Sequence, residues 1–387
     1  MKARLHIIIL GLLIALSACT QRDELAVDNT SNELPDLCDF TIGTSLATMQ
    51  GATSSRSLQP MGPEEENPVK QLAVIQFDSE GNLLEVNRYG TGISRYYHYR
   101  DFTNGGDLPG ELSPTLTGIT LFTLEQTRVC FIGNMEREGV EALIQQDGTT
   151  NRVGWTDFQN KTVTINYITE GDNVGHVERI YLFGYYDGAL TGNGSLDDGT
   201  SAGQMSVVLS RLIARLEISI NLAEGVILPD GYNIYFRLQN VEEEAYLFLD
   251  VERSNYVHRH SELMPTTNRT DYITSTDFTT FYFYVAPHLV MREEKDTEAT
   301  RLLIWCTTEG PENLDEERAY DILLCNDPRE ENPTAAGAYW LNRNSVYHVN
   351  VTLTHGDEGR AVSSRSIKEE GGGYHYWVDL QDIINKN

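Results

Sequence analysis

Cys19 is the residue whose type and position most clearly point to a chemical reaction. Two basic residues, Lys2 and Arg4, precede an apolar run at residues 7–16, and two small residues at 17 and 18 lead into the cysteine. The run is shorter than the roughly 20 apolar residues that cross a bilayer, so residues 1–18 predict an export signal. A thiol at the end of such a signal can carry acyl chains, which add about 0.8 kcal/mol per buried CH₂ group and tie a protein to a membrane.

The tetrapeptide L-S-A-C at residues 16–19 resembles the lipobox of bacterial lipoproteins, in which the cysteine is diacylated and becomes the new N-terminus. The resemblance implies that residues 1–18 are a lipoprotein signal peptide and that Cys19 carries lipid such as palmitate. Thr20, and not an aspartate, follows the cysteine, which is similar to lipoproteins sorted to the cell outer membrane. The alternative is a signal peptide followed by an incidental cysteine.

Other residues that could do chemistry do not form a recognisable catalytic or metal-binding set. The sequence contains no G-x-S-x-G, H-E-x-x-H or P-loop pattern. His258 and His260 could face one side of a strand or loop, but no third ligand is placed beside them, so surface histidines are expected. The Asp and Asn residues at 187–199 do not follow the order of a calcium-binding EF-hand loop. We therefore expect no enzyme activity, no cofactor and no metal.

Composition limits the classes of partner. The chain has 387 residues and a formal net charge of −28, and loss of Lys2 and Arg4 with the signal would bring the charge to about −30. Such a charge argues against a partner that is bound through its phosphates, so no nucleic acid is expected. The length suggests about two domains. Apart from Cys19, the four cysteines match no zinc spacing and are expected to be buried thiols, although an oxidising compartment would permit disulfides.

Alternation of apolar and polar residues with a period of two predicts an all-β fold with little helix. The many short strands favour β-sandwiches over a parallel α/β sheet. A Gly- and Asp-rich run at 187–203 places a domain boundary near residue 210, and a short helix is expected within 135–146. The expected strands are 37–44, 71–78, 128–133, 162–168, 180–186, 205–209, 215–222, 232–239, 245–250, 279–286, 301–307, 321–325 and 345–354.

The first expected strand, at 37–44, follows a polar tether and precedes a long loop. Cys38, Phe40 and Ile42 fall on one face of this strand and polar residues on the other, which predicts a half-buried edge strand. The loop at 48–67 is rich in Ser, Gly, Pro and Glu, so it should be exposed and accessible to proteases. Arg56 and Ser57 lie inside this loop.

Six local patterns, in order along the chain, resemble the fimbrillin family, the subunits of Bacteroidetes type V pili. They are an arginine at 56 ahead of an acidic spacer and the strand at 69–78, R-V-C-F-I-G-N at 128–134, L-S-R-L-I-A-R-L-E-I at 209–218, I-Y-F-R-L-Q-N-V at 234–241, Y-V-A-P at 284–287, and L-N-R-N-S-V-Y-H-V-N-V at 341–351. The resemblance implies two tandem transthyretin-like Greek-key β-sandwich domains. The implied parts are a signal peptide at 1–18, a tether with a removable first strand at 19–56, and sandwiches at 57–210 and 211–387.

In fimbrillins an Arg-specific protease cuts the loop after the first strand, and the strand and its lipid leave together. The resemblance implies cleavage between Arg56 and Ser57, which would remove Cys38, Phe40 and Ile42 and expose an apolar groove with unpaired main-chain groups. A strand from the next subunit would fill that groove. The alternative for Arg56 is an ordinary solvated loop arginine.

A donor strand is expected at 374–384, after three glycines at 371–373. Alternating residues of this segment share one apolar face: Tyr374, Tyr376, Val378 and Leu380. At about 3.3 Å per residue, the segment could reach about 35 Å. The alternative is an ordinary last strand of the second sandwich, which would favour a tip or anchor subunit over a stalk subunit.

The function implied is a structural and adhesive fimbrial subunit at the cell surface, exported as a lipoprotein to the outer membrane. Its partners would be other fimbrial subunits, in a homo- or heteropolymer, and the membrane before cleavage. The alternative function is a permanently anchored surface protein that binds a host glycan or protein.

Overall fold

The structure is a computed structural model in which fourteen segments can be described. They cover residues 37–47, 68–87, 94–106, 108–146, 151–168, 176–191, 203–248, 260–263, 279–290, 297–310, 319–325, 340–355, 367–368 and 374–384. The expected signal peptide, Cys19, Arg56, Ser57, His258 and the glycines at 371–373 lie outside these segments. No described helix is both long and apolar enough to cross a membrane.

The expectation of a mainly β chain with little helix is confirmed. The described strands are β1 (Leu37–Leu46), β2 (Gln71–Phe77), β3 (Tyr97–Asp101), β4 (Thr115–Phe122), β5 (Leu124–Gly133), β6 (Thr162–Thr164), β7 (Leu182–Leu190), β8 (Gly203–Arg211), β9 (Ala214–Leu222), β10 (Asn233–Glu242), β11 (Glu244–Tyr246), β12 (His260–Leu263), β13 (Thr279–Val285), β14 (His288–Leu289), β15 (Arg301–Thr307), β16 (Tyr320–Leu323), β17 (Trp340–Leu341), β18 (Val346–Thr354), β19 (Ile367–Lys368) and β20 (Tyr374–Asp379). The described helices are α3 (Arg137–Leu143), α4 (Trp155–Gln159) and α5 (Leu380–Ile383). The Greek-key connectivity remains a prediction.

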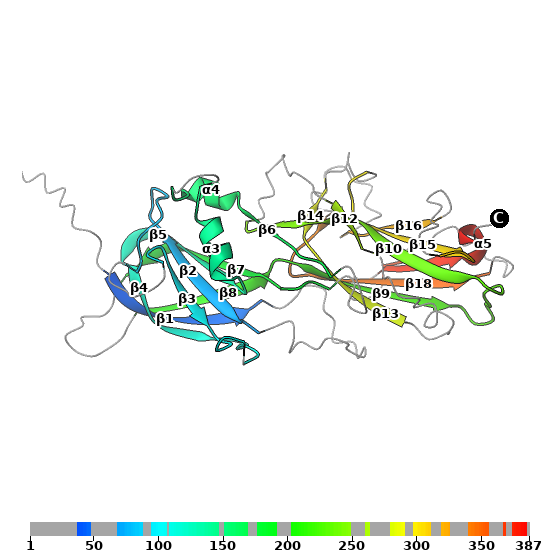
Figure 1. Ribbon diagram of the computed structural model, residues 1–387, viewed down its shortest axis with the longest axis horizontal. Coiled ribbons are helices and arrows are strands. Elements are labelled where there is room, and N and C mark those ends of the chain that lie inside the picture. The colour runs from blue at the N-terminus through cyan, green and yellow to red at the C-terminus, as the bar shows by residue number, and fades with distance from the viewer. Residues whose placement is uncertain are drawn as a thin grey trace, which may run out of the picture.

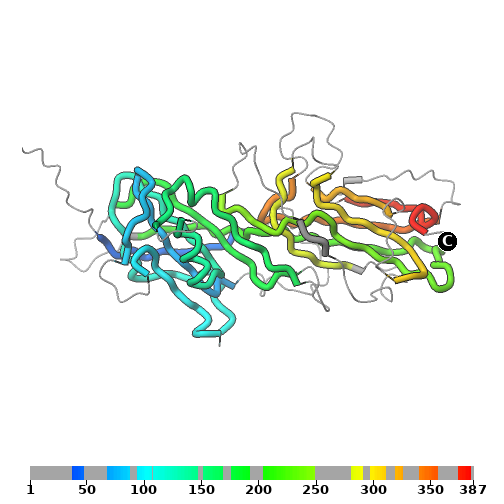
Figure 2. The backbone as a smooth tube through the Cα atoms, turned by 45° about the horizontal axis from the view of Figure 1, so that its top comes forward, coloured from blue at the N-terminus to red at the C-terminus, as the bar shows by residue number. Residues whose placement is uncertain are grey.

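Two groups of sheets lie end to end along an elongated molecule (Figure 1, Figure 2). The first group is one seven-stranded sheet in the order β3-β2-β5-β7-β8-β1-β4. Its central pair, β7 and β8, is joined only at Leu182↔Arg211 and Phe183↔Ser210. On either side of this short junction the strands separate into two layers, which share a core that includes Phe40, Val74 and Phe131.

The opposite face of the β2-β5-β7 layer is covered by α3 and α4. Ile75 and Cys130 point to this side and pack with Val140 of α3 and Phe158 of α4. Strand alternation explains the two cores, because successive residues of β2 and β5 point to opposite faces. The first group therefore has three layers, and β1 lies in the layer farthest from the helices.

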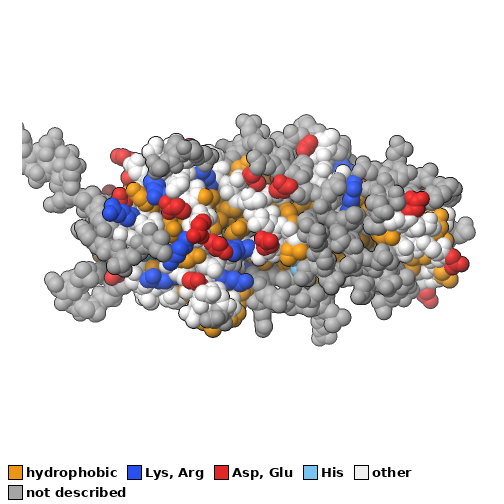
Figure 3. Space-filling view, viewed as in Figure 1, with side chains coloured by type: hydrophobic (Ala, Val, Ile, Leu, Met, Phe, Trp, Pro, Cys, Tyr) orange, Lys and Arg blue, Asp and Glu red, His pale blue; other side chains and the backbone are white. Residues whose placement is uncertain are grey.

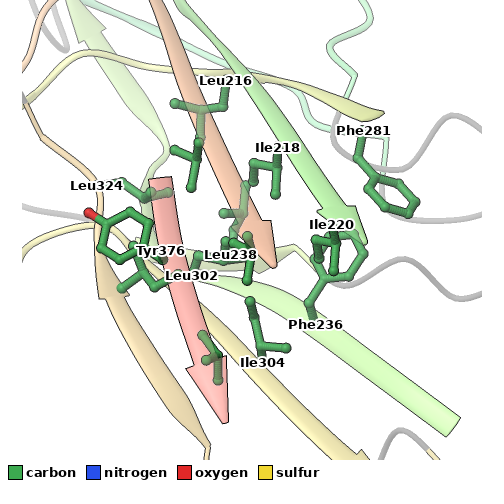
Figure 4. Close-up of a cluster of buried hydrophobic side chains, with 14 of the residues drawn as sticks. Leu216, Ile218, Ile220, Phe236, Leu238, Phe281, Leu302, Ile304, Leu324 and Tyr376 are labelled. Carbon is green, nitrogen blue, oxygen red and sulfur yellow. The ribbon is translucent and has the colours of Figure 1, made fainter. Parts of the chain in front are cut away.

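The second group is a sandwich of two sheets, in the orders β12-β10-β15-β16 and β13-β9-β18-β20-β19. Apolar residues of both sheets interdigitate between the layers, as Figure 4 shows for Ile218 of β9, Phe236 of β10 and Tyr376 of β20. Each of these strands contributes alternate side chains to this core, as half-buried strands do. The aromatic residues of β13 are divided between two cores: Phe281 and Phe283 enter this core, whereas Tyr284 enters the core beside α3 and α4.

The two groups are joined by strands and side chains that cross between them. β11, which follows β10 of the second group, pairs with β6, which precedes β7 of the first, and the two form a separate two-stranded sheet. Tyr167 donates its hydroxyl to the carbonyl of Glu242 at 2.5 Å and accepts from the amide of Ala286 at 2.9 Å. Burial raises the pKa of the Tyr167 hydroxyl far above its usual value, so the group remains a neutral donor and acceptor.

Candidate functional site

The first strand, β1, lies between two other strands. It pairs in parallel with β8, from Phe40↔Gly203 to Leu46↔Leu209, and antiparallel with β4, from Leu37↔Phe122 to Gly43↔Thr115. The expectation of an edge strand is therefore wrong. The alternation in 37–44 correctly predicted which face is buried, but it carries no information on how many neighbours a strand has.

The inward side chains of β1 fill the core between the two layers. Phe40 is 2% exposed and Ile42 is 0% exposed, while Cys38 lies half-buried at the rim. Asp39 on the outer face accepts a hydrogen bond from the hydroxyl of Thr120 at 2.7 Å. Full burial of one large apolar side chain contributes about 1.5–3 kcal/mol, so Phe40 and Ile42 account for about 3–6 kcal/mol of the attachment of β1.

Removal of β1 would leave a slot with two open walls. The main-chain groups of β8 and β4 that now bond to β1 would lose their partners, and each unsatisfied buried group costs about 1–3 kcal/mol. The floor of the slot would be apolar, because Leu116, Leu121 and Val207 pack against β1 in the same core. Such a slot is a template for another extended segment.

The far side of β4 is closed by side chains from the other layer. Gln76 of β2 is 0% exposed; its amide nitrogen donates to the carbonyl of Phe122 at 2.9 Å and its amide oxygen accepts from the Phe122 N–H at 2.9 Å. Nε2 of His98 on β3 lies 2.7 Å from the carbonyl of Thr120. Burial lowers the pKa of His98 below its usual 6.5, which favours the neutral ring. The wall formed by β4 is thus held in place independently of β1.

The downstream end of β1 reaches the junction between the two sheet groups. The amide of Ala47 donates to the carbonyl of Leu209 at 2.8 Å. Nη1 of buried Arg211 donates to the carbonyl of Ala47 and to Oδ1 of Asn344, each at 3.0 Å. Asn344 adopts a positive φ of 53°, which asparagine tolerates better than most residues. Its main-chain amide donates to the carbonyl of Ile213 at 2.7 Å. The residues at 211 and 344 belong to two of the patterns described above, and both have structural roles here.

The segment expected to be a donor strand lies in the protein's own second sandwich. β20 pairs in parallel with β18, from Val349↔Tyr374 to Thr354↔Asp379, and Tyr374, Tyr376 and Val378 enter the core of that sandwich. The expectation of one extended segment to residue 384 is wrong, because the strand ends at Asp379. Its side chain caps α5 by accepting from the amide of Gln381 at 2.9 Å, and Leu380 is the first residue of this helix.

The four described cysteines form no disulfide with one another. Cys130 is fully buried in the core beside α3 and α4, whereas Cys38 borders the core between the layers. Burial raises the pKa of the Cys130 thiol well above its usual value and that of Cys306 to about 12. No covalent bond to another described cysteine therefore ties β1 to the sheet.

Several residues that shape the slot were not identified from the sequence. β3 and β4 were not expected as strands, and neither Gln76 nor His98 was singled out. A buried glutamine inside an otherwise apolar strand is a usable signal, because buried amides require hydrogen-bond partners. Among the described residues, no group of three or more His, Cys, Asp or Glu side chains is placed to hold a metal ion.

Comparisons with known proteins give structural likenesses. No protein-family model matches the chain, and no curated protein matches it in sequence. The tip fimbrial protein Mfa3 of Porphyromonas gingivalis, with a C-terminal truncation, is similar over 81% of this chain and 94% of its own, with 13% identity and a TM-score of 0.47. A candidate cell adhesion protein of Parabacteroides distasonis matches 80% of this chain and 87% of its own, with 16% identity and a TM-score of 0.45. A fimbrial assembly protein of the same species matches 81% and 91%, with 12% identity and a TM-score of 0.41. Because their TM-scores are below 0.5, these likenesses carry no argument about function. The functional argument rests on the sequence and on the geometry of β1.

Proposed function

We propose that the protein is a structural and adhesive subunit of a fimbria, exported as a lipoprotein and assembled by exchange of its first strand. The observation that carries the proposal is the position of β1 between β8 and β4, with Phe40 and Ile42 in the core. A strand held in this way seals the sheet while it is present, and its loss would open a slot that only another extended segment can fill. This is the behaviour that the resemblance to fimbrillins implies.

In this proposal, acylated Cys19 holds the precursor at the outer membrane, and cleavage between Arg56 and Ser57 separates β1 from the rest of the chain. Residue 68 resumes the described chain in the other layer, where the amide of Val69 donates to the carbonyl of Glu111 at 2.7 Å. Because β1 and the next strand, β2, lie in different layers, a cut between them would divide no described strand. When β1 leaves, β4 would lose its strand partner and would stay attached through Gln76 and His98.

The position of β20 bears on the place of this subunit in the fimbria. Because Tyr374, Tyr376 and Val378 complete the second sandwich, donation of this strand would open the subunit's own core. This favours a subunit that accepts a strand without donating one, as expected at a tip or an anchor. It also keeps open the second function, a permanently tethered surface protein that binds a host glycan or protein.

The experiment that tests the proposal determines the N-terminal residue and the lipid content of the protein recovered from cell surface fractions. A start at Ser57 without lipid, together with assembly into high-molecular-weight polymers, is expected. Arg56→Ala should retain the lipid and block assembly, and Arg56→Lys should do the same if the protease is Arg-specific. Ser54→Ala in the same loop is the matched control and should be processed normally. A start at acylated Cys19 in the mature surface form would contradict trimming and would indicate a retained anchor or the tethered binding function.

A further inference from the structure

A hollow of about 730 Å³ lies between helix α3 and strand β6, away from the slot of β1. Met135, Gly139 and Ala142 form the wall on the α3 side, Thr162 and Thr164 form the opposite wall, and further lining residues come from the segment before β7. Its volume falls within the range of about 300–1,000 Å³ typical of ligand sites. We call this feature the β6–α3 hollow.

The edge of β6 opposite β11 has no partner at Thr162 and Thr164 among the described residues, whereas just beyond β6 the same edge pairs with residues 176–178 through Asn166 and Ile168. β6 and β11 form a two-stranded sheet in which Val163 faces Ala245. The main-chain amide of Ile165 donates to the carbonyl of Glu243 at 2.8 Å, and the carbonyl of Lys161 accepts from the main-chain amide of Leu247 at 3.2 Å. In an antiparallel pair the hydrogen-bonded residues alternate, so residues 161, 163 and 165 bond to β11.

The main-chain groups of Thr162 and Thr164 consequently point away from β11. Both residues line the β6–α3 hollow. The side chain of Thr164 is exposed, whereas that of Thr162 bonds to Oε2 of Glu244 at 2.9 Å and is held on the β11 side. The hollow therefore contains a short strand edge, in which the outward donors and acceptors of Thr162 and Thr164 are spaced for an extended chain.

The wall formed by α3 is closely packed and partly apolar. A Cβ atom added to Gly139 would lie 2.8 Å from Cγ of Met135, so the methionine packs directly over the helix at this point. Leu143 is buried beneath the same wall, and Tyr181 lies half-buried at the side. A strand edge facing a helix across a hollow of this size is the arrangement in which an added strand can bury its side chains.

The charged residues that line the hollow are Glu136, Glu138, Glu178, Lys161 and Arg179, which leaves a small acidic excess that favours a basic occupant. Glu136 is neutralised by Nη2 of Arg179 at 2.5 Å, whereas no described cation pairs with the exposed carboxylates of Glu138 and Glu178. Figure 3 shows acidic side chains over the part of the surface where α3 lies, with basic side chains among them. A lysine or arginine in the bound segment would meet one of these two carboxylates.

We propose that the β6–α3 hollow binds an extended segment of another protein, which carries a lysine or arginine and adds as a strand to the free edge of β6. The contact is distinct from the exchange of β1 and does not require cleavage. A compact polar ligand such as a sugar would leave the regular spacing of the strand edge unused. A basic extended peptide could bond to the strand edge, pack its side chains against α3 and place a positive charge beside Glu138 or Glu178.

The test measures fluorescence anisotropy of labelled peptides with the full-length protein. The probe is a nonapeptide of alternating threonine and valine with two lysines, and its charge control carries glutamate in place of lysine. Thr164→Pro removes the outward N–H without removing a bond to β11, since that N–H does not face β11. Thr164→Ala keeps the N–H and is the matched control. Hydrogen exchange measured with and without the basic peptide locates the contact.

Saturable binding of the basic peptide is expected, with slower amide exchange confined to residues 160–166 of the protein. Thr164→Pro should weaken binding at least tenfold, or about 1.4 kcal/mol, relative to Thr164→Ala. Glu138→Lys combined with Glu178→Lys should weaken it severalfold, whereas Glu224→Lys on the exposed surface of the second sandwich should not. The two charge reversals lie at exposed positions and should leave the fold intact, so they test the proposal even if Thr164→Pro unfolds the protein. Absence of saturable binding, equal binding of the acidic peptide, or protection outside β6 would overturn the proposal.

Discussion

Truncation of Ile42 should selectively destabilise the first sheet group. The side chain is 0% exposed and lies between strands β8 and β4. Ile42→Ala removes three carbon atoms, which corresponds to about 2.4 kcal/mol of transfer free energy, and the cavity left behind raises the expected loss to about 2–5 kcal/mol. Thr41→Ala, on the opposite face of the same strand, should change the free energy of unfolding by only about 0.5 kcal/mol.

The assay is urea unfolding followed by thiol labelling, read cysteine by cysteine by mass spectrometry. Cys130 is fully buried in the first group and Cys306 in the second, so each thiol reports the opening of its own group. With a urea dependence of about 2 kcal/mol per M, Ile42→Ala should lower the midpoint for Cys130 by about 1–2.5 M. The midpoint for Cys306 serves as the internal reference and should move much less.

The reasoning fails if Ile42→Ala and Thr41→Ala shift the Cys130 midpoint equally. That result would mean that β1 contributes little to the sheet in which it lies, and the proposed exchange would lose its energetic basis. An equal shift of both thiols in Ile42→Ala would mean instead that the junction makes the two groups unfold as one unit.

Three further predictions concern the walls around β1. Gln76→Ala should destabilise the first group by about 1–3 kcal/mol, because main-chain groups of β4 lose their partner; the same thiol assay measures it. Burial lowers the pKa of His98 in the folded protein below 6.5, so the unfolded chain binds more protons than the folded protein as the pH falls below that value. The free energy of unfolding should therefore be highest above pH 6.5 and should decrease as the pH falls. His98→Gln should flatten this dependence in urea titrations followed by circular dichroism, and an unchanged slope would contradict the assignment. Gly184→Ala should cost about 1–3 kcal/mol because its Cβ would lie 2.6 Å from the carbonyl of Val208, whereas Gly43→Ala, with no atom nearer than 3.9 Å, should be tolerated; equal unfolding midpoints would refute the contact.

Local patterns predicted the strongly apolar or clearly alternating strands well. The expected ranges 71–78, 215–222 and 301–307 differ from β2, β9 and β15 by at most a residue at one end. β2 and β15 are short apolar runs that are buried almost throughout, and β9 alternates apolar with polar residues along its whole length. By contrast, β4 contains three threonines and a glycine with φ of 65°, and a bulge interrupts its pairing with β1. A bulge breaks the period on which the prediction depends.

The neighbours of a strand could not be predicted in the same way. β1 pairs with β8, which lies more than 150 residues away in sequence, and nothing local encodes that partner. The apolar face of 374–380 was identified, but its continuation as a strand was wrong because the cap at Asp379 was overlooked. Asp followed by L-Q-D is a usual start of a helix, so this element was available from local chemistry. The residues that form the β6–α3 hollow carry no motif, since the hollow exists only through the pairing of β6 with β11.

The parallel pairing of β1 with β8 has a consequence for how subunits could be arranged in line. β1 starts at the end of the molecule farthest from the second sandwich and runs towards the junction at Ala47 and Arg211 (Figure 1). A replacement strand in the same direction would enter at that far end, so the body of its parent subunit would lie beyond the first sheet group. Because β20 stays in this subunit's own sandwich, the contact would join the far end of this molecule to a donor subunit of another kind, which is a heterologous contact. The direction of a single strand would thus decide which end of this subunit faces its donor.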